Sequence, residues 1–443
     1  MEMVDIRPRE EMSADVLVVG GGAAGLACAL AAARRGRSVI LLERYGFSGG
    51  AAVAGLSGTV CGLYAASDRR NAPPEQVVHG FVDEFLALME AKGGITGPVA
   101  YGKTYTRVHD PLVWREAADH LLTAEAKIRV LYHATVTGVI ADGDHVAGVH
   151  VFTKQGPLEV RARITVDASG DADVAAMAGR ALTKGRDGAI QNPTMIFRVL
   201  GVDVPRFLEA HGPDSILDER VSHLISDLNA SGAYHLPRAK IFLFTTPRPG
   251  ELLCNATRII GADGRELDAT RAADLSEAEV EGRRQVREYA RFIRDHIAGC
   301  EASFVNDTGV QVGIRQTWQI VGVDRLMNDD VTSARKRPDG ICRSPWPIEL
   351  HSGTKPKLHW ILDDYYEVPL NCFIPATGTG LVMAGRSLSA EHEAMASARV
   401  TAQCFGYGQA MGLVADRLCD DPSRMPTGAD IRAELNRLGA ALD

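Results

Sequence analysis

Residues 15–43 read DVLVVGGGAAGLACALAAARRGRSVILLE and decide the fold of this chain. The apolar run at 16–19 predicts a buried parallel strand, which passes directly into glycines at positions 20, 22 and 25. Glycines at this spacing allow a tight turn, a close backbone approach to a pyrophosphate, and close packing of the next helix on the strand. The N-terminus of that helix presents free N–H groups to an anion. The segment therefore predicts the first strand, turn and helix of a dinucleotide-binding unit.

The second half of the segment completes this unit. Gly36 is expected to end the helix, and residues 38–42 predict a second strand that runs into Glu43. Glu43 follows Gly25 by eighteen residues, a spacing at which an acidic side chain accepts hydrogen bonds from an adenosine ribose. Three such glycines alone are often only a glycine-rich turn. Strand, glycines, helix, second strand and acid in register favour adenine dinucleotide binding.

The composition excludes several classes of protein. The 443 residues are enough for two or three domains, or for one large α/β domain with an insertion. A hydrophobic content of 46% and a charged content of 23% are ordinary for a soluble globular protein and argue against disorder. With a net charge of −8 and no long basic cluster, neither nucleic acid nor an anionic membrane surface is an expected partner.

The sequence contains no signal for a membrane span, for secretion or for a metal cluster. No stretch approaches the roughly 18 consecutive apolar residues of a membrane helix, and the N-terminus has no apolar signal core, so we expect a cytoplasmic protein. The eight cysteines are scattered without a CxxC pair. This excludes a dithiol of the thioredoxin reductase type and gives no support for an iron–sulfur cluster or structural zinc, so no metal site is expected.

Beyond Glu43 the hydrophobic pattern predicts helices, a strand followed by a small β-meander, and a return to α/β texture near the C-terminus. Helices are expected at 73–92, at 111–124 and, rich in small residues, at about 393–418. The expected strands cover 128–132, 135–141, 146–152, 163–166 and 381–384.

The alternation of strands and helices is interrupted in the middle of the chain. Residues 190–365 contain proline, tryptophan and long polar stretches in place of regular βα units, and predict a substrate domain. The expected organisation is a cofactor domain whose first part covers 1–189 and whose C-terminal part covers 366–443.

The chain contains one GxGxxG motif. A second would indicate separate sites for a flavin and a nicotinamide, whereas a single motif also fits an NAD dehydrogenase. Gly378-Thr379-Gly380 precedes its strand and is better explained as a turn. A simple NAD dehydrogenase usually continues with regular βα units, so the β-meander and the C-terminal βα element favour a flavoprotein with the two-dinucleotide fold.

Six segments, together with Glu43, resemble a known family: GGGAAGLACALAAARRG (20–36), GFSGGAA (46–52), VDASGDADVAAMAG (166–179), GIRQTWQIVG (313–322), PWPIELH (345–351) and VMAGRSLSAEHEAMASARVTAQCFGYGQAMG (382–412). The chain resembles FAD-dependent oxidoreductases related to the fumarate reductase and glutathione reductase flavoproteins, over nearly its whole length. The resemblance implies an α/β fold with a Rossmann-like FAD-binding domain of the glutathione reductase type, a β-meander and an inserted α+β substrate domain.

The same resemblance implies a noncovalent FAD site. Relatives of the fumarate reductase type can attach flavin through a histidine near the loop after Glu43, and residues 49–55 contain none. Flavin hydroxylases usually place Gly-Asp at a late ribityl contact where this chain has Gly385-Arg386, which weakens a monooxygenase interpretation. The expected cofactor-binding residues are Gly20, Gly22, Ala24, Gly25, Glu43, Arg44, Gly49, Gly50, Ala51, Val136, Gly170, Gly385 and Arg386.

Three residues are candidates for the chemistry. His351 ends the PWPIELH segment, and His392 lies between two glutamates just before the helix expected to face the flavin. A histidine can take the proton of an alcohol or amine during oxidation, and a neighbouring carboxylate raises its basicity. Arg315 is a candidate for binding an anionic substrate group. Each also has a structural explanation: an interior histidine for His351, a helix cap for His392 and an ion pair for Arg315.

The sequence therefore predicts an FAD-dependent oxidase or dehydrogenase that transfers hydride between a small organic substrate and the flavin N5. Oxygen, a quinone or a protein carrier is the expected electron acceptor, because a second nucleotide motif, a dithiol and a cluster motif are missing. Two alternatives stay open. One is an NAD(P)H-dependent flavin monooxygenase acting on an aromatic or heteroaromatic substrate, and the other is a flavoprotein acting on a partner polypeptide.

Overall fold

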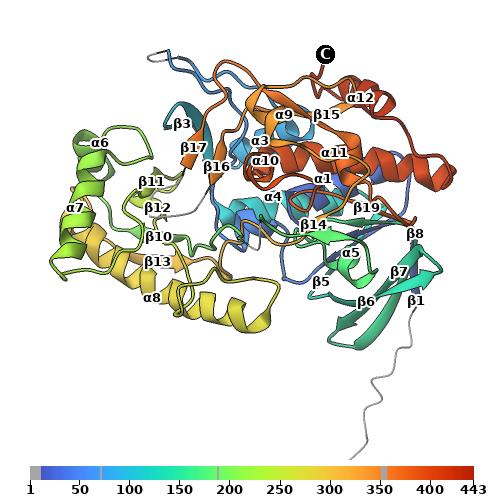
Figure 1. Cartoon of the computed structure of the whole chain (residues 1–443), viewed down its shortest axis with the longest axis horizontal. Coiled ribbons are helices and arrows are strands. Elements are labelled where there is room, and N and C mark those ends of the chain that lie inside the picture. The colour runs from blue at the N-terminus through green and yellow to red at the C-terminus, as the bar shows by residue number, and fades with distance from the viewer. Residues whose placement is uncertain (1–10, 70–71, 187–188, 351–356) are drawn as a thin grey trace, which may run out of the picture.

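A seven-stranded sheet built on the glycine-rich unit forms the centre of one half of the molecule (Figure 1). The computed structural model describes residues 11–69, 72–186, 189–350 and 357–443. The strand order is β5-β2-β1-β8-β7-β6, with β19 beside β8. These strands are β1 (Glu11–Val19), β2 (Val39–Glu43), β5 (Ile128–Tyr132), β6 (Thr135–Asp142), β7 (His145–Thr153), β8 (Gly156–Asp167) and β19 (Leu381–Met383).

The sheet has a parallel part and an antiparallel part. Strand β1 pairs in parallel with β2 and β8, β2 with β5, and β19 with β8. The antiparallel meander β6-β7-β8 continues the sheet on one side, so that β8 belongs to both parts. The predicted α/β fold with a Rossmann-like sheet and a β-meander is thereby confirmed, and the strands expected at 128–132, 135–141 and 146–152 are present.

Two helices rich in small residues pack against each other beside this sheet. Helix α1 (Ala23–Arg34) follows the glycine turn, and α11 (Thr401–Asp420) comes from the C-terminal part of the chain. A Cβ on Gly408 of α11 would lie 2.0 Å from the carbonyl oxygen of Ala24. Only glycine permits this approach, so the small residues of both helices are explained by close packing.

A second, antiparallel sheet with its own helices lies on the opposite side of the molecule, at the left of Figure 1. Its strand order is β11-β12-β10-β13, and α6, α7 and α8 accompany it. These elements are β10 (Phe197–Leu200), α6 (Val204–His211), α7 (Glu219–Ala230), β11 (Phe242–Thr245), β12 (Glu251–Asn255), α8 (Ala272–His296) and β13 (Phe304–Thr308). The expected insertion of α+β type is therefore present.

Two large hydrophobic cores correspond to these two halves. The core of the antiparallel sheet extends from Met195 to Ile314. Buried residues from Ile320 to Ile374 pack into the core of the Rossmann-like sheet. The boundaries at 190 and 365 stay a prediction, and we propose that the C-terminal boundary of the substrate domain lies nearer residue 315.

The remaining elements are short or connect the two halves. They are α2 (Gly50–Val53), α3 (Phe81–Ala91), β3 (Ile95–Tyr101), β4 (Thr104–His109), α4 (Pro111–Ala124), α5 (Asp173–Met177), β9 (Leu182–Thr183), β14 (Gln319–Ile320), α9 (Asn328–Thr332), β15 (Gly340–Ser344), β16 (Ile348–Leu350), β17 (Lys357–His359), β18 (Tyr366–Pro369), the 3-10 helix η1 (Leu370–Phe373), α10 (His392–Ala398) and α12 (Gly428–Arg437).

Two predicted helices differ from the structure. The helix expected at 73–92 begins only at Phe81, because Gly80 has a φ of 105° and its N–H donates to the Asp83 carboxylate, which fixes the start there. The helix expected at 393–418 is two helices, α10 and α11, separated at Arg399 and the extended residue Val400. The break gives α11 its own N-terminus in the interior.

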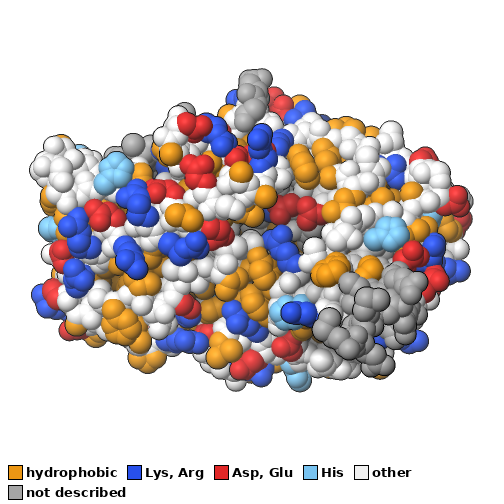
Figure 2. Space-filling model, turned by 90° about the horizontal axis from the view of Figure 1, so that it is seen from below, with side chains coloured by type: hydrophobic (Ala, Val, Ile, Leu, Met, Phe, Trp, Pro, Cys, Tyr) orange, Lys and Arg blue, Asp and Glu red, His pale blue; other side chains and the backbone are white. Residues whose placement is uncertain are grey.

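On the face shown in Figure 2, Lys and Arg side chains are interspersed with Asp and Glu and with scattered hydrophobic side chains. All eight cysteines are free, and six of them are buried. In the described ranges, no helix combines the length and the apolar character that crossing a membrane requires.

Candidate cofactor and substrate site

A cavity of about 1260 Å³, open to solvent, lies where β1, β2 and β8 end. Ligands of open α/β sheets bind at these carboxyl ends of the strands. The lining includes Val19, Leu42 and Ala168 from or next to those strand ends, and Ala384 after β19. We call this the cofactor cavity.

The glycine turns form a cradle that side chains would fill. Gly20 has a φ of 103°, and a Cβ there would lie 2.4 Å from the carbonyl oxygen of Ala168. A Cβ on Gly50 would lie 2.9 Å from the Cα of Gly22. The two glycine-rich loops therefore approach each other through backbone alone, which fits the close contact that a pyrophosphate needs.

Two helices begin at this cavity without a side-chain cap. Ala23 and Ala24 in the first turn of α1 line it, and so do Thr401 and Cys404 in the first turn of α11. Neither first turn contains an acidic residue, and no side chain accepts a hydrogen bond from its N–H groups. Both N-termini can therefore present N–H groups and a partial positive charge to an anionic or electron-rich ligand.

Glu43 lies buried at the end of β2, with 5% of its surface exposed. Its Oε2 accepts the N–H of Gly21 at 2.8 Å, and its Oε1 accepts the N–H of Tyr45 at 2.9 Å. Burial raises the pKa of Glu43, while these backbone hydrogen bonds oppose the rise. The carboxylate is thus fixed at the cavity wall and retains acceptor capacity for ribose hydroxyls.

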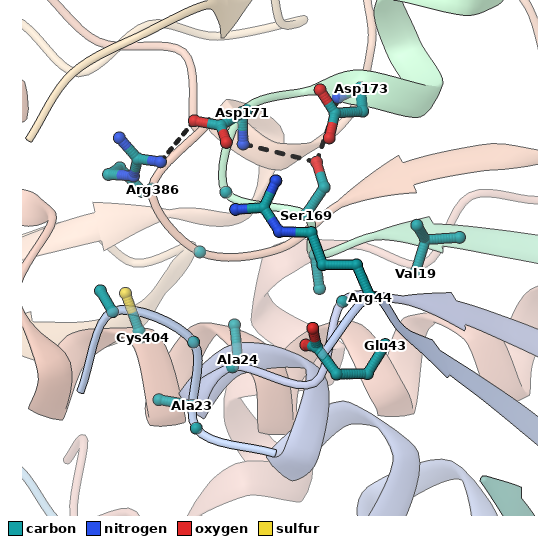
Figure 3. A pocket seen from close by; sticks show the side chains of 18 of the residues that line it. Val19, Ala23, Ala24, Glu43, Arg44, Ser169, Asp171, Asp173, Arg386 and Cys404 are labelled. Carbon is teal, nitrogen blue, oxygen red and sulfur yellow. Dashed lines mark hydrogen bonds and ion pairs between the residues drawn. The ribbon is translucent and has the colours of Figure 1, made fainter. Parts of the chain in front are cut away.

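A polar cluster borders the cavity opposite Glu43 (Figure 3). The Arg386 guanidinium donates to Asp171 Oδ1 at 2.5 Å, and the Thr317 hydroxyl donates to the same oxygen at 2.8 Å. Ser169 accepts the backbone N–H of Asp173 at 3.1 Å. Burial, reinforced by the Asp171 and Asp167 carboxylates, raises the pKa of Asp173 to about 7.

The structure brings most of the predicted cofactor-binding residues into one lining. Those that line the cavity are Gly20, Gly22, Ala24, Glu43, Arg44, Gly49, Gly50, Ala51, Val136, Gly170, Gly385 and Arg386. Gly25 does not line it. A Cβ there would lie 1.8 Å from the carbonyl oxygen of Gly20, so Gly25 allows the helix to pack on the turn, as its place in the motif predicts.

A second cavity, of about 830 Å³, adjoins the first. The two cavities share the lining residues Ala51, Ile314, Arg386, Arg399 and Thr401. The second cavity lies between the two halves of the chain, because its walls include Ile196, Phe244 and Asn255 from the antiparallel sheet and its surroundings. We call it the substrate cavity.

Tyr101 and Glu349 meet at the wall of the substrate cavity. Tyr101, at the end of β3, donates its hydroxyl hydrogen to Glu349 Oε1 at 2.8 Å, and both residues are buried. Burial, followed by the Glu349 charge, holds the pKa of the Tyr101 phenol well above its usual value, so the phenol stays protonated. The pair therefore combines a hydrogen-bond donor and a carboxylate that can hold a proton.

Arginines approach the same cavity from different segments. Arg315 is 8% exposed and donates to the carbonyl oxygen of Asn192 at 2.7 Å. Arg399 lines both cavities and donates to the side-chain oxygen of Gln191 at 3.1 Å. Burial, together with the positive charges of Arg399 and Arg238, lowers the pKa of Arg315 to about 9.

The three predicted catalytic residues differ in where they lie relative to the two cavities. Arg315 lines the substrate cavity. His351 lies outside the described residues. His392 begins α10 and lines neither cavity, and its pKa is lowered, first by burial. Its Nδ1 is buried without a hydrogen-bond partner.

Several residues of the substrate cavity were not predicted as functional. Tyr101 lies in a segment for which no element is expected, and Arg399 and Thr401 belong to a segment whose pattern predicts a continuous helix. Glu349 lies in the PWPIELH segment, and its carboxylate is the feature of that segment that could have indicated a functional residue. Neither glycine nor proline occurs at the break between α10 and α11. The sequence therefore does not indicate that Arg399 lies at a helix end beside the cavities.

Comparisons with known proteins identify the family of the chain and structures with a similar fold. Residues 15–434 match the family described as FAD dependent oxidoreductase. No curated protein sequence matches the chain. A geranylgeranyl bacteriochlorophyll reductase-like protein from Thermoplasma acidophilum has a similar fold, with a TM-score of 0.50 and 15% identity over 97% of this chain and 83% of that one. The flavin-dependent brominase Bmp2 has a TM-score of 0.51 and 14% identity, over 96% and 83% of the two chains.

The two solved structures support the fold alone at these identities, whereas the family match covers most of the sequence. The glycine cradle, the buried acid and the uncapped helix N-termini fit a bound dinucleotide. The chain belongs to the FAD-dependent oxidoreductase family and is an enzyme whose cofactor is FAD.

Proposed function

We propose that this enzyme transfers hydride between the N5 atom of FAD and a small organic substrate bound in the substrate cavity. The observation that carries the proposal is the shared wall of the two cavities, formed by Ala51, Ile314, Arg386, Arg399 and Thr401. A ligand in the second cavity can contact a cofactor in the first only across this wall. A continuous pocket with apolar walls and a few polar groups is typical of small-molecule sites.

Residues of the cofactor cavity would hold FAD noncovalently along its length. Glu43 would accept hydrogen bonds from the ribose, and the glycine cradle at 20, 22 and 50 would approach the pyrophosphate. The residues Gly385, Arg386 and Thr401 would lie along the ring end. The uncapped N-terminus of α11 there would stabilise negative charge on the reduced ring.

Bound FAD supplies the hydride acceptor for oxidation and the hydride donor for reduction. The chain must then handle the proton of the substrate hydroxyl or amine. We assign this proton to Glu349, whose carboxylate is oriented by the Tyr101 hydroxyl at 2.8 Å. His392 is less suitable, because it lines neither cavity.

The electron acceptor is proposed to be oxygen, a quinone or a protein carrier.

We also propose that the enzyme is related to flavoproteins of the fumarate reductase and glutathione reductase type. The meander and the α+β insertion support this relation, and so does the resemblance of the six sequence segments.

Anaerobic spectroscopy tests the proposal. The purified enzyme is expected to show the visible bands of bound FAD, and one member of a panel of alcohols, amines and acids is expected to bleach them without NAD(P)H. Bleaching by NAD(P)H that a bound aromatic substrate accelerates would instead support a monooxygenase. Flavin that no small molecule or NAD(P)H bleaches would contradict the proposed function.

A further inference from the structure

The described lining of the substrate cavity contains three arginines, Arg315, Arg386 and Arg399, and one carboxylate, that of Glu349. Arg315 and Arg399 donate their hydrogen bonds to neutral oxygens, those of Asn192 and Gln191. Among the residues that the structure describes, neither guanidinium has a carboxylate at ion-pair distance. Arg386 differs, because it forms an ion pair with Asp171 at 2.5 Å. Buried charges are normally paired, so this cavity is arranged for an additional negative group.

The surroundings strengthen this imbalance. The described lining of the cavity contains a single carboxylate, Glu349, and its Oε1 accepts the Tyr101 hydroxyl hydrogen. Arg238 is buried nearby, and its Nη1 donates to the side-chain oxygen of the lining residue Asn255 at 2.8 Å. The pKa values of Arg315 and Arg399 are both lowered, first by burial; the Glu349 charge opposes the shift at both residues, and neighbouring arginines add to it. An anion between them would reverse part of this effect.

Part of the cavity wall is aromatic. Tyr101 stacks on Phe244 with ring centroids 6.0 Å apart and an interplanar angle of 8°, and its ring centre lies 5.3 Å from that of Trp346. Phe244, Trp346 and Ile196 line the cavity. A ligand that satisfies both the arginines and this aromatic part has a planar anionic group at one end and an apolar body at the other.

We propose that the substrate is a small organic acid, whose carboxylate lies between Arg315 and Arg399 and whose apolar body contacts Trp346 and Phe244. A guanidinium presents parallel N–H donors that match the two oxygens of a carboxylate. Because Arg399 and Thr401 line both cavities, the carboxylate would lie near their junction. The carbon that reacts is therefore expected within a few bonds of the carboxylate. This inference rests on the proposed function of the same site.

A pair of matched probes tests the inference on the FAD-bound enzyme. Benzoate and benzamide have the same ring and differ in charge, and their affinities are measured by calorimetry and by the change in the flavin spectrum. Benzoate is expected to bind at least about tenfold more tightly, a difference of roughly 1.4 kcal/mol. Equal affinities would overturn the inference, and so would competition by inorganic phosphate as strong as that of benzoate.

Substitutions assign the effect to the two arginines. Arg315→Gln and Arg399→Gln are each expected to reduce benzoate binding to the level of benzamide. Arg258→Gln is the matched control, because Arg258 is partly buried, has a pKa lowered first by burial and lines neither cavity. A preference for benzoate that survives both cavity variants would contradict the inference.

The same experiment separates this inference from the proposed function. Enzyme without bound FAD would contradict the proposed function itself. Enzyme that binds FAD and is bleached by a neutral substrate, but does not prefer benzoate, would contradict only the assignment of an organic acid. If Arg315→Gln does not fold, the comparison of benzoate with benzamide on the wild-type enzyme still decides the question.

Discussion

Glu43 is the residue that most directly determines where the FAD ribose would lie in the cofactor cavity. It connects the end of β2 to the glycine turn through the N–H of Gly21 at 2.8 Å, and it lines the cofactor cavity. We expect Glu43→Ala to weaken FAD binding about 10- to 100-fold, because a buried acceptor for the ribose and the turn is lost. Titration of apoprotein with FAD measures this. Glu209→Ala, at an exposed glutamate of α6, is the control, and unchanged affinity in Glu43→Ala would refute this position of the ribose.

Glu349 is the residue to which we assign proton transfer. With the substrate that the anaerobic panel identifies, Glu349→Gln is expected to slow flavin bleaching by about 10²- to 10⁴-fold, since the amide keeps the size of the side chain but cannot accept the proton. The visible spectrum should be unchanged, because Glu349 does not line the cofactor cavity. Wild-type bleaching rates in this variant would exclude Glu349 as the base.

The raised pKa of Asp173 predicts how the stability of the apoprotein depends on pH. Its pKa is raised to about 7 in the folded state, first by burial, against a reference value of 3.8. The free energy of unfolding therefore falls as the pH rises from about 4 through 7, and the whole decrease is present above pH 7. Asp173→Asn should stabilise the apoprotein at pH 8 by about 1–2 kcal/mol after solvent screening, and by nothing near pH 4.

Chemical denaturation at several pH values measures this effect. Asp142→Asn, at an exposed position in the meander, is the matched control and should show no such dependence. A pH-independent difference between Asp173→Asn and the wild type would mean that the carboxyl group is not buried as described.

At the scale of elements, the contact between α1 and α11 joins segments from the two ends of the chain beside the Rossmann-like sheet. Gly408→Ala is expected to destabilise the protein by roughly 1–3 kcal/mol or more, because the new methyl group would meet the Ala24 carbonyl oxygen at 2.0 Å. A Cβ on Gly97 meets no atom within 4 Å, so Gly97→Ala is the control for a change of glycine alone. Denaturant unfolding measures both, and equal stabilities would contradict this packing.

Elements with a strong local pattern were predictable from the sequence. The run at 16–19, the glycine turn and the strands of the meander follow from periodicity and from the turn residues. The two helix errors have different causes. At Gly80 a positive φ and a local hydrogen bond to the Asp83 carboxylate fix the start of α3. After Arg399 and Val400 a distant contact accompanies the start of α11, because the Ala402 N–H donates to the carbonyl oxygen of Cys61.

At the scale of the whole molecule, the two cavities differ in how far the sequence predicts them. The cofactor cavity is built largely from local motifs, so most of its expected residues line it. The substrate cavity joins positions near 61, 101, 196, 244, 315, 349 and 399, which no local pattern connects. Arg315 was found through its segment, whereas Tyr101 and Arg399 acquire their role only when the two halves of the chain meet.

The most direct test of this account is the position of the flavin in a crystal structure of the enzyme with FAD. We predict the ribose at Glu43, the adenine beside Val136, and the isoalloxazine ring at the wall shared by the cavities, in contact with Ala51, Arg386 and Thr401. A flavin ring outside this shared wall, or an FAD bound in the reverse direction, would contradict the central claim that the second cavity presents substrate to the flavin.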